Sequence, residues 1–305
     1  MAIKSSKYKT PMLPYQTLSR FGKQIKIGKP NLRLFYFVAG EENPENLLLI
    51  HGLGDEADTW RHVINPLSER FRVFALDLPG FGRSEKPNID YTPELFSKTI
   101  IQFMDQLEIN NAILIGSSLG GILSHHFAIN HPERVKGLIL VGGSLLQPKA
   151  MLDLRLIIMS LPIIGKWLYT SLRKDSDKAY ATLNNVYYRI HEMPDSDRTF
   201  LYNRVNQRVW DDGQRRAYLS TLRKMGPWIK QRQKSLPNQL KNLQIPTLVI
   251  RGEKDRLFLE ETAQSIIDIQ PEAKKATIPN TGHLPQQEDP HAFLEIVTNW
   301  INENI

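Results

Sequence analysis

The sequence predicts an α/β fold: a mostly parallel sheet flanked by helices, with an inserted helical cap. Apolar runs of strand type alternate with helical patterns up to residue 143, and the alternation returns from residue 246. Between them, residues 145–240 show helical patterns only. Strands that alternate with helices are typical of a parallel sheet with crossover connections. We therefore divide the chain into residues 1–144, the first part of the core, 145–240, the cap, and 241–305, the second part of the core.

The first part of the core contains five predicted strands, each rich in Leu, Ile, Val or Phe. They cover residues 32–38, 47–50, 71–76, 113–115 and 135–141 and follow a polar arm, residues 1–20, that we expect to lie on the core. Between the strands we expect helices over residues 58–70 and 92–107, and a third that ends before Pro132. Thr92 is suited to cap the second of these helices.

The cap is predicted to consist of several helices, because no strand pattern interrupts it. Its first part, residues 151–169, is dense in Leu, Ile and Met and contains Trp167. The second part of the core then supplies strands over residues 246–252 and 275–278 and helices over residues 259–269 and 291–302. Proline and glycine predict breaks within the cap near Pro162, Gly165, Pro194, Gly213 and Pro227.

The composition is that of a globular protein of 305 residues, with 41% hydrophobic and 23% charged residues. The absence of cysteine excludes disulfides, thiolate zinc sites and a cysteine nucleophile, and it favours a reducing compartment. No apolar segment follows the basic N-terminal residues, and no uncharged run approaches the length that spans a membrane. We therefore expect a soluble, cytoplasmic protein.

The formal net charge of +7 is concentrated in the cap. Residues 145–240 hold 17 of the 39 basic and 8 of the 32 acidic residues, a net charge of +9, which leaves −2 for the rest. A solvated charged face explains this simply, and an anionic partner such as a membrane surface is the alternative. Nucleic-acid binding is not expected, because no zinc-finger spacing or RNA-binding aromatic motif accompanies the charge.

Gly116-Ser117-Ser118-Leu119-Gly120 follows a predicted strand and precedes a helical pattern. A serine in such a strand–turn–helix elbow has its hydroxyl lifted above the sheet, and glycine two residues before and after it lets strand and helix pass closely. Ser118 has glycine at both positions, whereas Ser117 has Ile115 and Leu119 there. Ser118 is therefore the candidate nucleophile.

A serine hydroxyl needs a base to take its proton and a third group to orient that base. Asp255 lies just beyond the strand predicted over residues 246–252, and His283 lies just beyond the strand over 275–278. Glu253 is a second carboxylate in the same loop, and His51 is another histidine at a strand end, but its Gly52-Leu53-Gly54 turn is better suited to supply backbone N–H groups.

Two further patterns carry less weight. Gly80-Phe81-Gly82 lacks the third glycine of a dinucleotide fingerprint, because position 85 is Glu. His125 and His126 are adjacent, so on a helix their side chains point about 100° apart. They are predicted to be packing residues rather than joint metal ligands.

Taken together, these motifs resemble the α/β-hydrolase superfamily, in its capped serine esterase-like branch. The resemblance covers nearly the whole core and rests on four stretches: residues 51–54, 77–84 and 116–121, and the loops that carry Asp255 and His283. It implies that the backbone N–H groups of Leu53 and Leu119 form an oxyanion hole, and Trp60 matches a tryptophan common in the branch. No metal or organic cofactor is implied.

The expected function is a serine hydrolase that cleaves an ester or related acyl bond through Ser118, His283 and Asp255. Serine in place of aspartate at position 118 argues against epoxide hydrolase and haloalkane dehalogenase chemistry. The same three residues would also serve a carbon–carbon bond hydrolase, an acyltransferase or a perhydrolase, and a ligand receptor that keeps the fold is an alternative of another class. The expected partner is a small, apolar ester substrate bound under the cap, together with a peripheral contact between the basic cap and anionic membrane.

Overall fold

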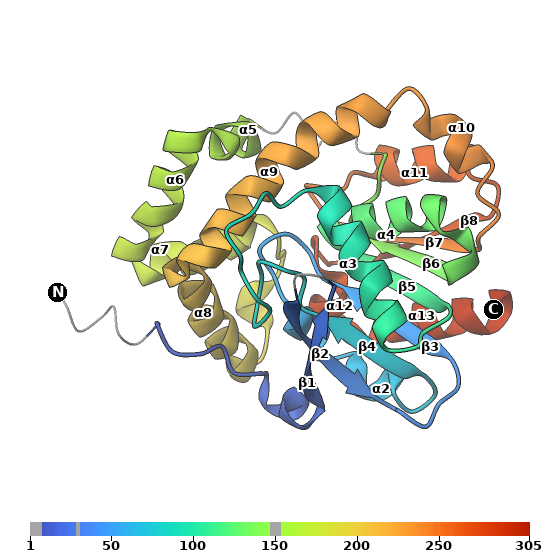
Figure 1. The fold of residues 1–305 in the computed structure, drawn as a ribbon, viewed down its shortest axis with the longest axis horizontal. Helices are drawn as coiled ribbons and strands as arrows, with labels where there is room; N and C mark the ends of the chain where they lie inside the picture. The colour runs from blue at the N-terminus through green and yellow to red at the C-terminus, as the bar shows by residue number, and fades with distance from the viewer. Residues whose placement is uncertain (1–7, 29–30, 147–153) are drawn as a thin grey trace.

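A single sheet of eight strands forms the centre of the structure, a computed structural model that describes residues 8–28, 31–146 and 154–305 (Figure 1). The strand order is β1-β2-β4-β3-β5-β6-β7-β8. β2 is antiparallel to both neighbours, and the pairs from β4 to β8 are all parallel, so the predicted mostly parallel sheet is confirmed. The strands are β1 (Gly22–Ile27), β2 (Leu32–Ala39), β3 (Asn46–Ile50), β4 (Arg72–Leu76), β5 (Ala112–Ser117), β6 (Val135–Val141), β7 (Thr247–Gly252) and β8 (Ala273–Ile278).

Strand β1 has no counterpart in the sequence-based assignment. Its residues, Gly-Lys-Gln-Ile-Lys-Ile, are mostly polar and only the last is buried. β1 lies at the edge of the sheet and pairs only with β2. An edge strand needs little apolar surface because one side and one face meet water, so the hydrophobic pattern is weak.

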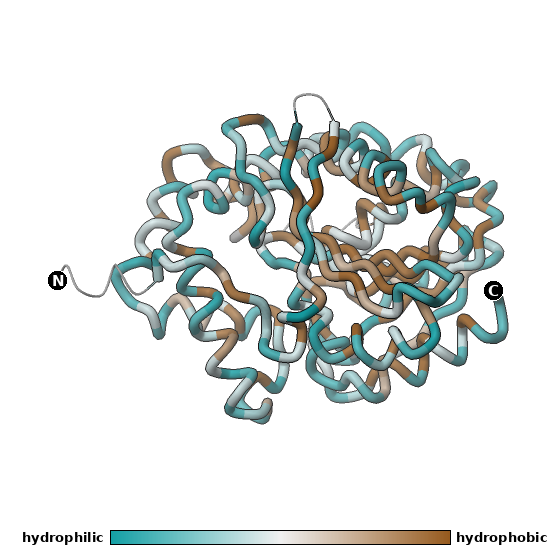
Figure 2. The backbone as a smooth tube through the Cα atoms, turned by 60° about the horizontal axis from the view of Figure 1, so that its bottom comes forward, coloured by the Kyte–Doolittle hydropathy of each residue, from teal (hydrophilic) through white to brown (hydrophobic). Residues whose placement is uncertain are grey.

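The core consists of two apolar layers, one on each face of the sheet. Helices α3 (Pro93–Gln106), α4 (Leu119–Asn130) and α11 (Glu260–Ile269) pack on one face through residues such as Phe103, Phe127 and Ile266. The other face is covered by the short helices η2 (Ala57–Trp60) and α2 (Ile64–Leu67) and by α13 (Pro290–Asn304), with Trp60 and Phe293 in contact. Figure 2 shows the strands between these layers as the most hydrophobic part of the chain.

The helix predicted over residues 58–70 is wrong. The chain forms instead the 3-10 helix η2 and, three residues later, the single turn α2. Pro66 has no N–H to continue a helical ladder toward His62. Upstream, the Asp58 and Arg61 side chains are buried and engaged in ion pairs, which hold this segment in an irregular path.

Residues 154–240 of the inserted segment, which the structure describes, are helical, as predicted. Figure 1 shows α5, α6, α7 and α8 at one end of the molecule, with α5 and α6 at the outer edge, and α9 running from α8 across to α10, which lies beside α11. Met151 and Leu152, at the start of the apolar stretch, lie outside the described residues. The α-helices of the segment are α5 (Leu154–Ser160), α6 (Pro162–Ser171), α7 (Ser176–Ala181), α8 (Asp195–Trp210), α9 (Asp212–Arg232) and α10 (Leu236–Lys241).

The breaks predicted near Pro162, Pro194 and Gly213 coincide with the starts of α6, α8 and α9, but those at Gly165 and Pro227 are wrong. Gly165 lies inside α6, where a Cβ would overlap the Met159 carbonyl of α5, so glycine permits close packing there. Pro227 lies inside α9, which continues because the neighbouring residues, including Trp228, are buried in the core.

The N-terminal arm is confirmed for its described part, because the backbone N–H of Tyr15 donates to Asp58 over 2.6 Å and Arg204 of α8 donates to the carbonyl of Leu13. The arm ends in the 3-10 helix η1 (Gln16–Phe21), which precedes β1. Among the helices that the structure describes, none combines the length and the apolar character needed to cross a bilayer.

Candidate functional site

Ser118 occupies the sharp turn between β5 and α4. Its backbone has φ 53° and ψ −113°, a strained left-handed conformation for a residue with a side chain. A Cβ at Gly116 would overlap the carbonyl of Gly120, and a Cβ at Gly120 would overlap the carbonyl of Ile50 in β3. The two glycines are therefore required for α4 to leave the sheet at this angle, as the elbow motif predicts.

The neighbouring Ser117 differs from Ser118 in position and surroundings. Ser117 is the last residue of β5 and fully buried, and its hydroxyl accepts a hydrogen bond from Gln286 over 3.2 Å. Ser118 is half-buried and lies in the turn itself. The structure thus places Ser117 in an internal hydrogen-bond network and Ser118 at the end of the sheet.

Asp255 and His283 are brought together although 28 residues separate them. Oδ2 of Asp255 lies 2.8 Å from Nδ1 of His283, and each residue is 5% exposed. Oδ1 of the same carboxylate accepts the backbone N–H groups of Leu257 and Phe258 over 2.8 and 3.0 Å. These bonds hold the carboxylate in one orientation, so it accepts a hydrogen bond from the N–H of Nδ1 and leaves Nε2 free to act as an acceptor.

Ser118 and His283 lie against two consecutive glycines that follow β6. A Cβ at Gly142 would stand 3.1 Å from Nδ1 of His283, and one at Gly143 would overlap the backbone of Ser118. Gly142 has φ 62°, and its N–H donates to the carbonyl of Ile250 in β7 over 2.9 Å. The ends of β5, β6 and β7 therefore gather the serine and the histidine at one edge of the sheet.

The turn after β3 lies beside the same serine. The N–H of Asp55 donates to the carbonyl of Gly52 over 3.3 Å, which closes a turn with Leu53 at its first central position. A Cβ at Gly52 would be 3.8 Å from Oγ of Ser118. Leu119 is the first residue of α4, and the first N–H groups of a helix have no intrahelical partner. Leu53 and Leu119 thus flank Ser118 from two directions.

His51 ties this turn to the loop of residues 77–84. Its ring is fully buried; Nδ1 lies 2.7 Å from the carbonyl of Gly52, and Nε2 accepts the N–H of Leu78 over 2.9 Å. The two bonds are compatible when Nδ1 carries the proton. Both ring nitrogens of His51 therefore contact backbone groups, which tie the turn of residues 52–54 to Leu78.

A buried ionic cluster anchors the 77–84 loop to the helical segment. Arg83 pairs with Asp77 over 2.8 Å and with Asp58 over 2.5 Å, and Arg208 of α8 pairs with Glu56 over 2.7 Å. Burial favours a raised pKa for Glu56, but the neighbouring arginines, Arg208 foremost, outweigh it and lower the pKa to about 2. The charged residues of the sequence motif, Asp77 and Arg83, are thus held in buried ion pairs beside the site.

Glu288 connects the loop of His283 to the helical segment, a role that the sequence analysis missed. Its carboxylate accepts the N–H of Gly282 over 2.7 Å and those of residues 188–189 over 2.8 Å each. The N–H of His283 itself donates to the carbonyl of Val186 over 2.8 Å. Burial raises the pKa of Glu288, although these N–H groups favour its ionised form. The inserted helical segment therefore fixes the backbone of Gly282 and His283.

A second hydrogen-bond network, around Gln287 next to Glu288, was also not predicted. Arg61 donates to Oε1 of Gln287 and pairs with Asp197 of α8 over 2.5 Å, and the hydroxyl of Tyr187 donates to the same Gln287 oxygen over 2.8 Å. The buried amide group of Gln287 donates to Thr59 over 2.7 Å. The only pattern in the sequence that indicates these contacts is the polar run Gln-Gln-Glu of the short helix α12 (Pro285–Glu288), which follows His283 directly.

Glu288→Gln is expected to lower kcat about tenfold with KM nearly unchanged, because an amide cannot accept all three N–H groups and a charge-assisted hydrogen bond contributes about 1.5–3 kcal/mol. Steady-state kinetics on a hydrolysable small-molecule substrate, together with thermal unfolding, measure this. Glu192→Gln is the matched control, because Glu192 is exposed and pairs with Arg189 near the same contact. An unchanged kcat, or an equal loss in both variants, would contradict the positioning role of Glu288.

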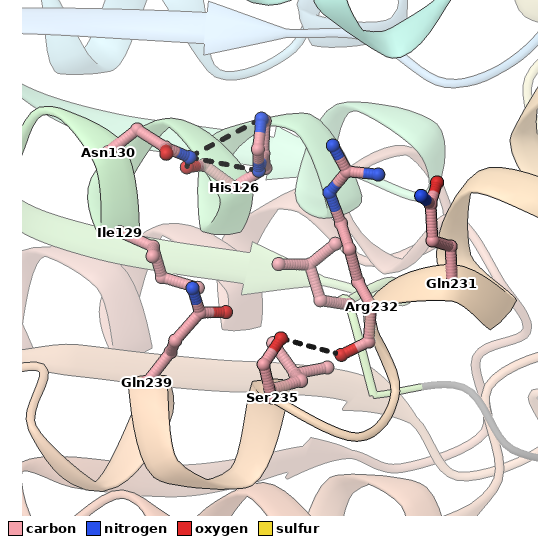
Figure 3. Close-up of a pocket in the computed structure, with 9 residues that line it drawn as sticks. His126, Ile129, Asn130, Gln231, Arg232, Ser235 and Gln239 are labelled. Atoms are coloured by element: carbon pink, nitrogen blue, oxygen red, sulfur yellow. Dashed lines mark hydrogen bonds between the residues drawn. The ribbon is translucent and has the colours of Figure 1, made fainter.

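The adjacent His125 and His126 of α4 lie outside this site. His125 is fully buried, and burial lowers its pKa to about 3. His126 stacks edge-on against Trp228, with ring centroids 4.8 Å apart, so both are packing residues as predicted. His126 also lines a cavity of about 370 Å³ between α4, α9 and α10, shown in Figure 3 with Arg232 and Gln239 on the facing side. His126 follows Ser118 by eight residues, which corresponds to ~12 Å along a helix, so this cavity is separate from the serine turn.

The sheet order, the strained serine turn and the Asp255–His283 pair define a hydrolase of the α/β type. The model of the α/β hydrolase fold family matches residues 45–290, which is most of the chain. The chain therefore belongs to the α/β hydrolase fold family.

Particular relatives are more distant. The 2-hydroxy-6-oxo-6-(2'-aminophenyl)hexa-2,4-dienoic acid hydrolase of Metapseudomonas resinovorans is 28% identical over 273 residues, 88% of this chain and 87% of the relative. A crystal structure of a meta-cleavage product hydrolase matches with a TM-score of 0.75 and 25% identity over 93% of this chain and 98% of the other. Bifunctional epoxide hydrolase 2 of Mus musculus is 24% identical, over 91% of this chain but 55% of the relative. Family and relatives support a hydrolase of small molecules.

Proposed function

We propose that this protein is a serine hydrolase in which Ser118 is the nucleophile, His283 the general base and Asp255 the group that orients it. The observation that carries the proposal is the buried Asp255–His283 hydrogen bond of 2.8 Å at the strand ends, beside a serine with φ 53°. Oγ of Ser118 attacks the acyl carbon while Nε2 of His283 takes its proton. The protonated ring then gives that proton to the leaving group, and water releases the acyl chain by the same route.

The negative charge that develops on the carbonyl oxygen requires donors at fixed positions. We assign this role to the backbone N–H groups of Leu53 and Leu119. The closed turn at Gly52–Asp55 and the start of α4 support the assignment, because both groups belong to backbone that secondary structure and the His51 hydrogen bonds hold in place. An oxyanion-hole donor typically contributes about 3–4 kcal/mol to transition-state stabilisation.

The helical segment, residues 145–240, acts in this proposal as a cap that makes the site apolar. Support comes from α9: a Cβ at Gly54 would lie 3.0 Å from the ring of Tyr218, and one at Gly80 would overlap Ala217. Leu53, Leu119 and Leu145 belong to the same apolar cluster as Tyr218 and Ala217. Apolar walls over a reacting centre favour hydrophobic substrates and exclude water.

The bond cleaved is proposed to be a carboxylic ester, with carbon–carbon bond hydrolysis as the second candidate. The second candidate is favoured by the names of the relatives, because a hydroxy-oxo-dienoic acid contains a ketone and no ester, so its hydrolysis breaks a carbon–carbon bond. Serine at position 118, rather than aspartate, argues against epoxide hydrolysis. The cytoplasmic location expected from the lack of cysteine stays a prediction, as does the peripheral membrane contact of the cap.

Among p-nitrophenyl esters, kcat/KM is expected to rise about fourfold for each added methylene until the pocket is filled, because each buried methylene contributes about 0.8 kcal/mol. The measurement is an ester panel from acetyl to long chains, with a meta-cleavage dienoate assayed in parallel and a fluorophosphonate probe to count active sites. A preference for acetyl esters would contradict the apolar pocket. Turnover of the dienoate without ester turnover would replace the first candidate by the second, and single-turnover hydrolysis would favour a receptor.

A further inference from the structure

We propose that the α5–α6 hairpin docks the protein on anionic bilayers. Five apolar side chains on this hairpin remain in water: Ile163 is 84% exposed, Trp167 67%, and Ile157, Leu161 and Ile164 43–45%. They make up five of the nine large hydrophobic side chains exposed in the described residues. Such a group on one hairpin is typical of a contact surface rather than of scattered surface residues.

The orientation of α6 explains why this surface stays exposed. Ile163 and Trp167 are four residues apart and therefore share one face of the helix. Gly165 and Tyr169 lie on the opposite face and are buried against α5 and α9. Both faces of α6 are therefore apolar, and packing within the cap uses only one of them.

The positive charge of the hairpin favours an anionic surface as its binding partner. Residues 154–174 contain four basic and no acidic residues. Arg173 pairs with Asp212 of α9, but within the described part of the chain no acidic side chain lies within ion-pair distance of Lys166 or Lys174. Lys166 is exposed and lies one turn of α6 from Ile163, so ammonium groups border the apolar face. Apolar residues flanked by lysine are the pattern of an interfacial helix on anionic lipid.

The position of the hairpin allows a flat surface to reach it. Figure 1 shows α5 and α6 at the outer edge of the helical segment, on the side of α9 away from the sheet. An exposed tryptophan suits the boundary between headgroups and acyl chains. Docking would bring the cap to apolar esters dissolved in the membrane, so its purpose rests on the proposed function. Binding to the bilayer itself requires no turnover.

The test is sedimentation of the full chain with vesicles of ether-linked phosphatidylcholine, alone or mixed with ether-linked phosphatidylglycerol, at low and high salt. Ether lipids contain no ester, so hydrolysis does not disturb the result. We expect binding to the phosphatidylglycerol vesicles that high salt weakens. Ile163→Asn combined with Trp167→Asn is expected to abolish it, and Lys166→Gln to lower the affinity about fivefold, the effect of one lysine near an anionic surface.

Ile89→Asn is the matched control, because Ile89 is 44% exposed and lies outside the hairpin. It is expected to leave vesicle binding unchanged, and circular dichroism checks the fold of every variant. Absence of wild-type binding, binding that ignores salt and lipid charge, or binding retained by the double variant would overturn the proposal. A dimer in sedimentation velocity that the double variant dissolves would also overturn it, in favour of a second copy of the chain as occupant. Fluorophosphonate labelling tests Ser118 separately, so failure of docking is distinguishable from failure of the proposed hydrolase.

Discussion

Ser118→Ala is expected to lower kcat/KM on esters by about 10⁴-fold or more, because no other oxygen in the turn can form the acyl-enzyme. The fold should be retained. The conformation at position 118 is set by the backbones of Gly116, Gly120 and Gly143, which leave no room for Cβ atoms, and none of these contacts involves the hydroxyl. The measurements are steady-state kinetics and fluorophosphonate labelling. The variant should no longer be labelled.

Ser117→Ala is the matched control. Ser117 is adjacent, has the same side chain and is fully buried, and its hydroxyl accepts only the Gln286 hydrogen bond that the structure records for it. We expect a loss of about 1 kcal/mol in the free energy of unfolding and little change in kcat/KM. If activity were retained by Ser118→Ala but lost in Ser117→Ala, the proposal would have named the wrong serine as the nucleophile.

Asp255→Asn is expected to lower kcat/KM by about 10⁴-fold while the protein remains folded. Oδ1 of the asparagine can still accept the N–H groups of Leu257 and Phe258, so the amide nitrogen would take the place of Oδ2, 2.8 Å from Nδ1 of His283. An N–H donor there would force Nδ1 to accept and place the ring proton on Nε2. The ring could then no longer take the proton of Ser118.

Glu253→Gln controls for the charge, because Glu253 is the other carboxylate of the loop and its contacts are to Lys254 and the N–H of Asn280. It should remain close to wild type. Full activity of Asp255→Asn, or an equal loss in Glu253→Gln, would remove Asp255 from the mechanism.

Local chemistry made several parts of the molecule predictable from the sequence. The elbow around Ser118 was identified because glycine at positions 116 and 120 has a steric purpose that depends only on residues a few positions apart. Thr92 was expected to cap a helix, and its hydroxyl accepts the N–H of Leu95 over 3.2 Å. The buried strands β3 to β7 have continuous apolar runs, so hydrophobic pattern alone identifies them.

Features that depend on partners far along the chain escaped prediction. The helix predicted over residues 58–70 is interrupted upstream of Pro66, where the buried Arg61 pairs with Asp197, 136 residues away, a contact that the local sequence does not indicate. Gly165 and Pro227 look like helix breakers locally, yet packing against Met159 and burial of Trp228 keep both inside helices. In each case a tertiary contact outweighs a local preference, which amounts to only about 1–3 kcal/mol per residue.

The sequence by itself determined the fold class, the order of serine, aspartate and histidine along the chain, and the position of the elbow at Ser118 rather than Ser117, because each depends on short-range sterics or on strand and helix periodicity. Only the tertiary structure decided that Asp255 lies within hydrogen-bond distance of His283, that Glu288 joins the histidine loop to the helical segment, and that Ile163 and Trp167 face outward. The physical reason is that a side chain's partner depends on how strands and helices pack, and residue spacing along the chain does not encode the orientation of one element against another.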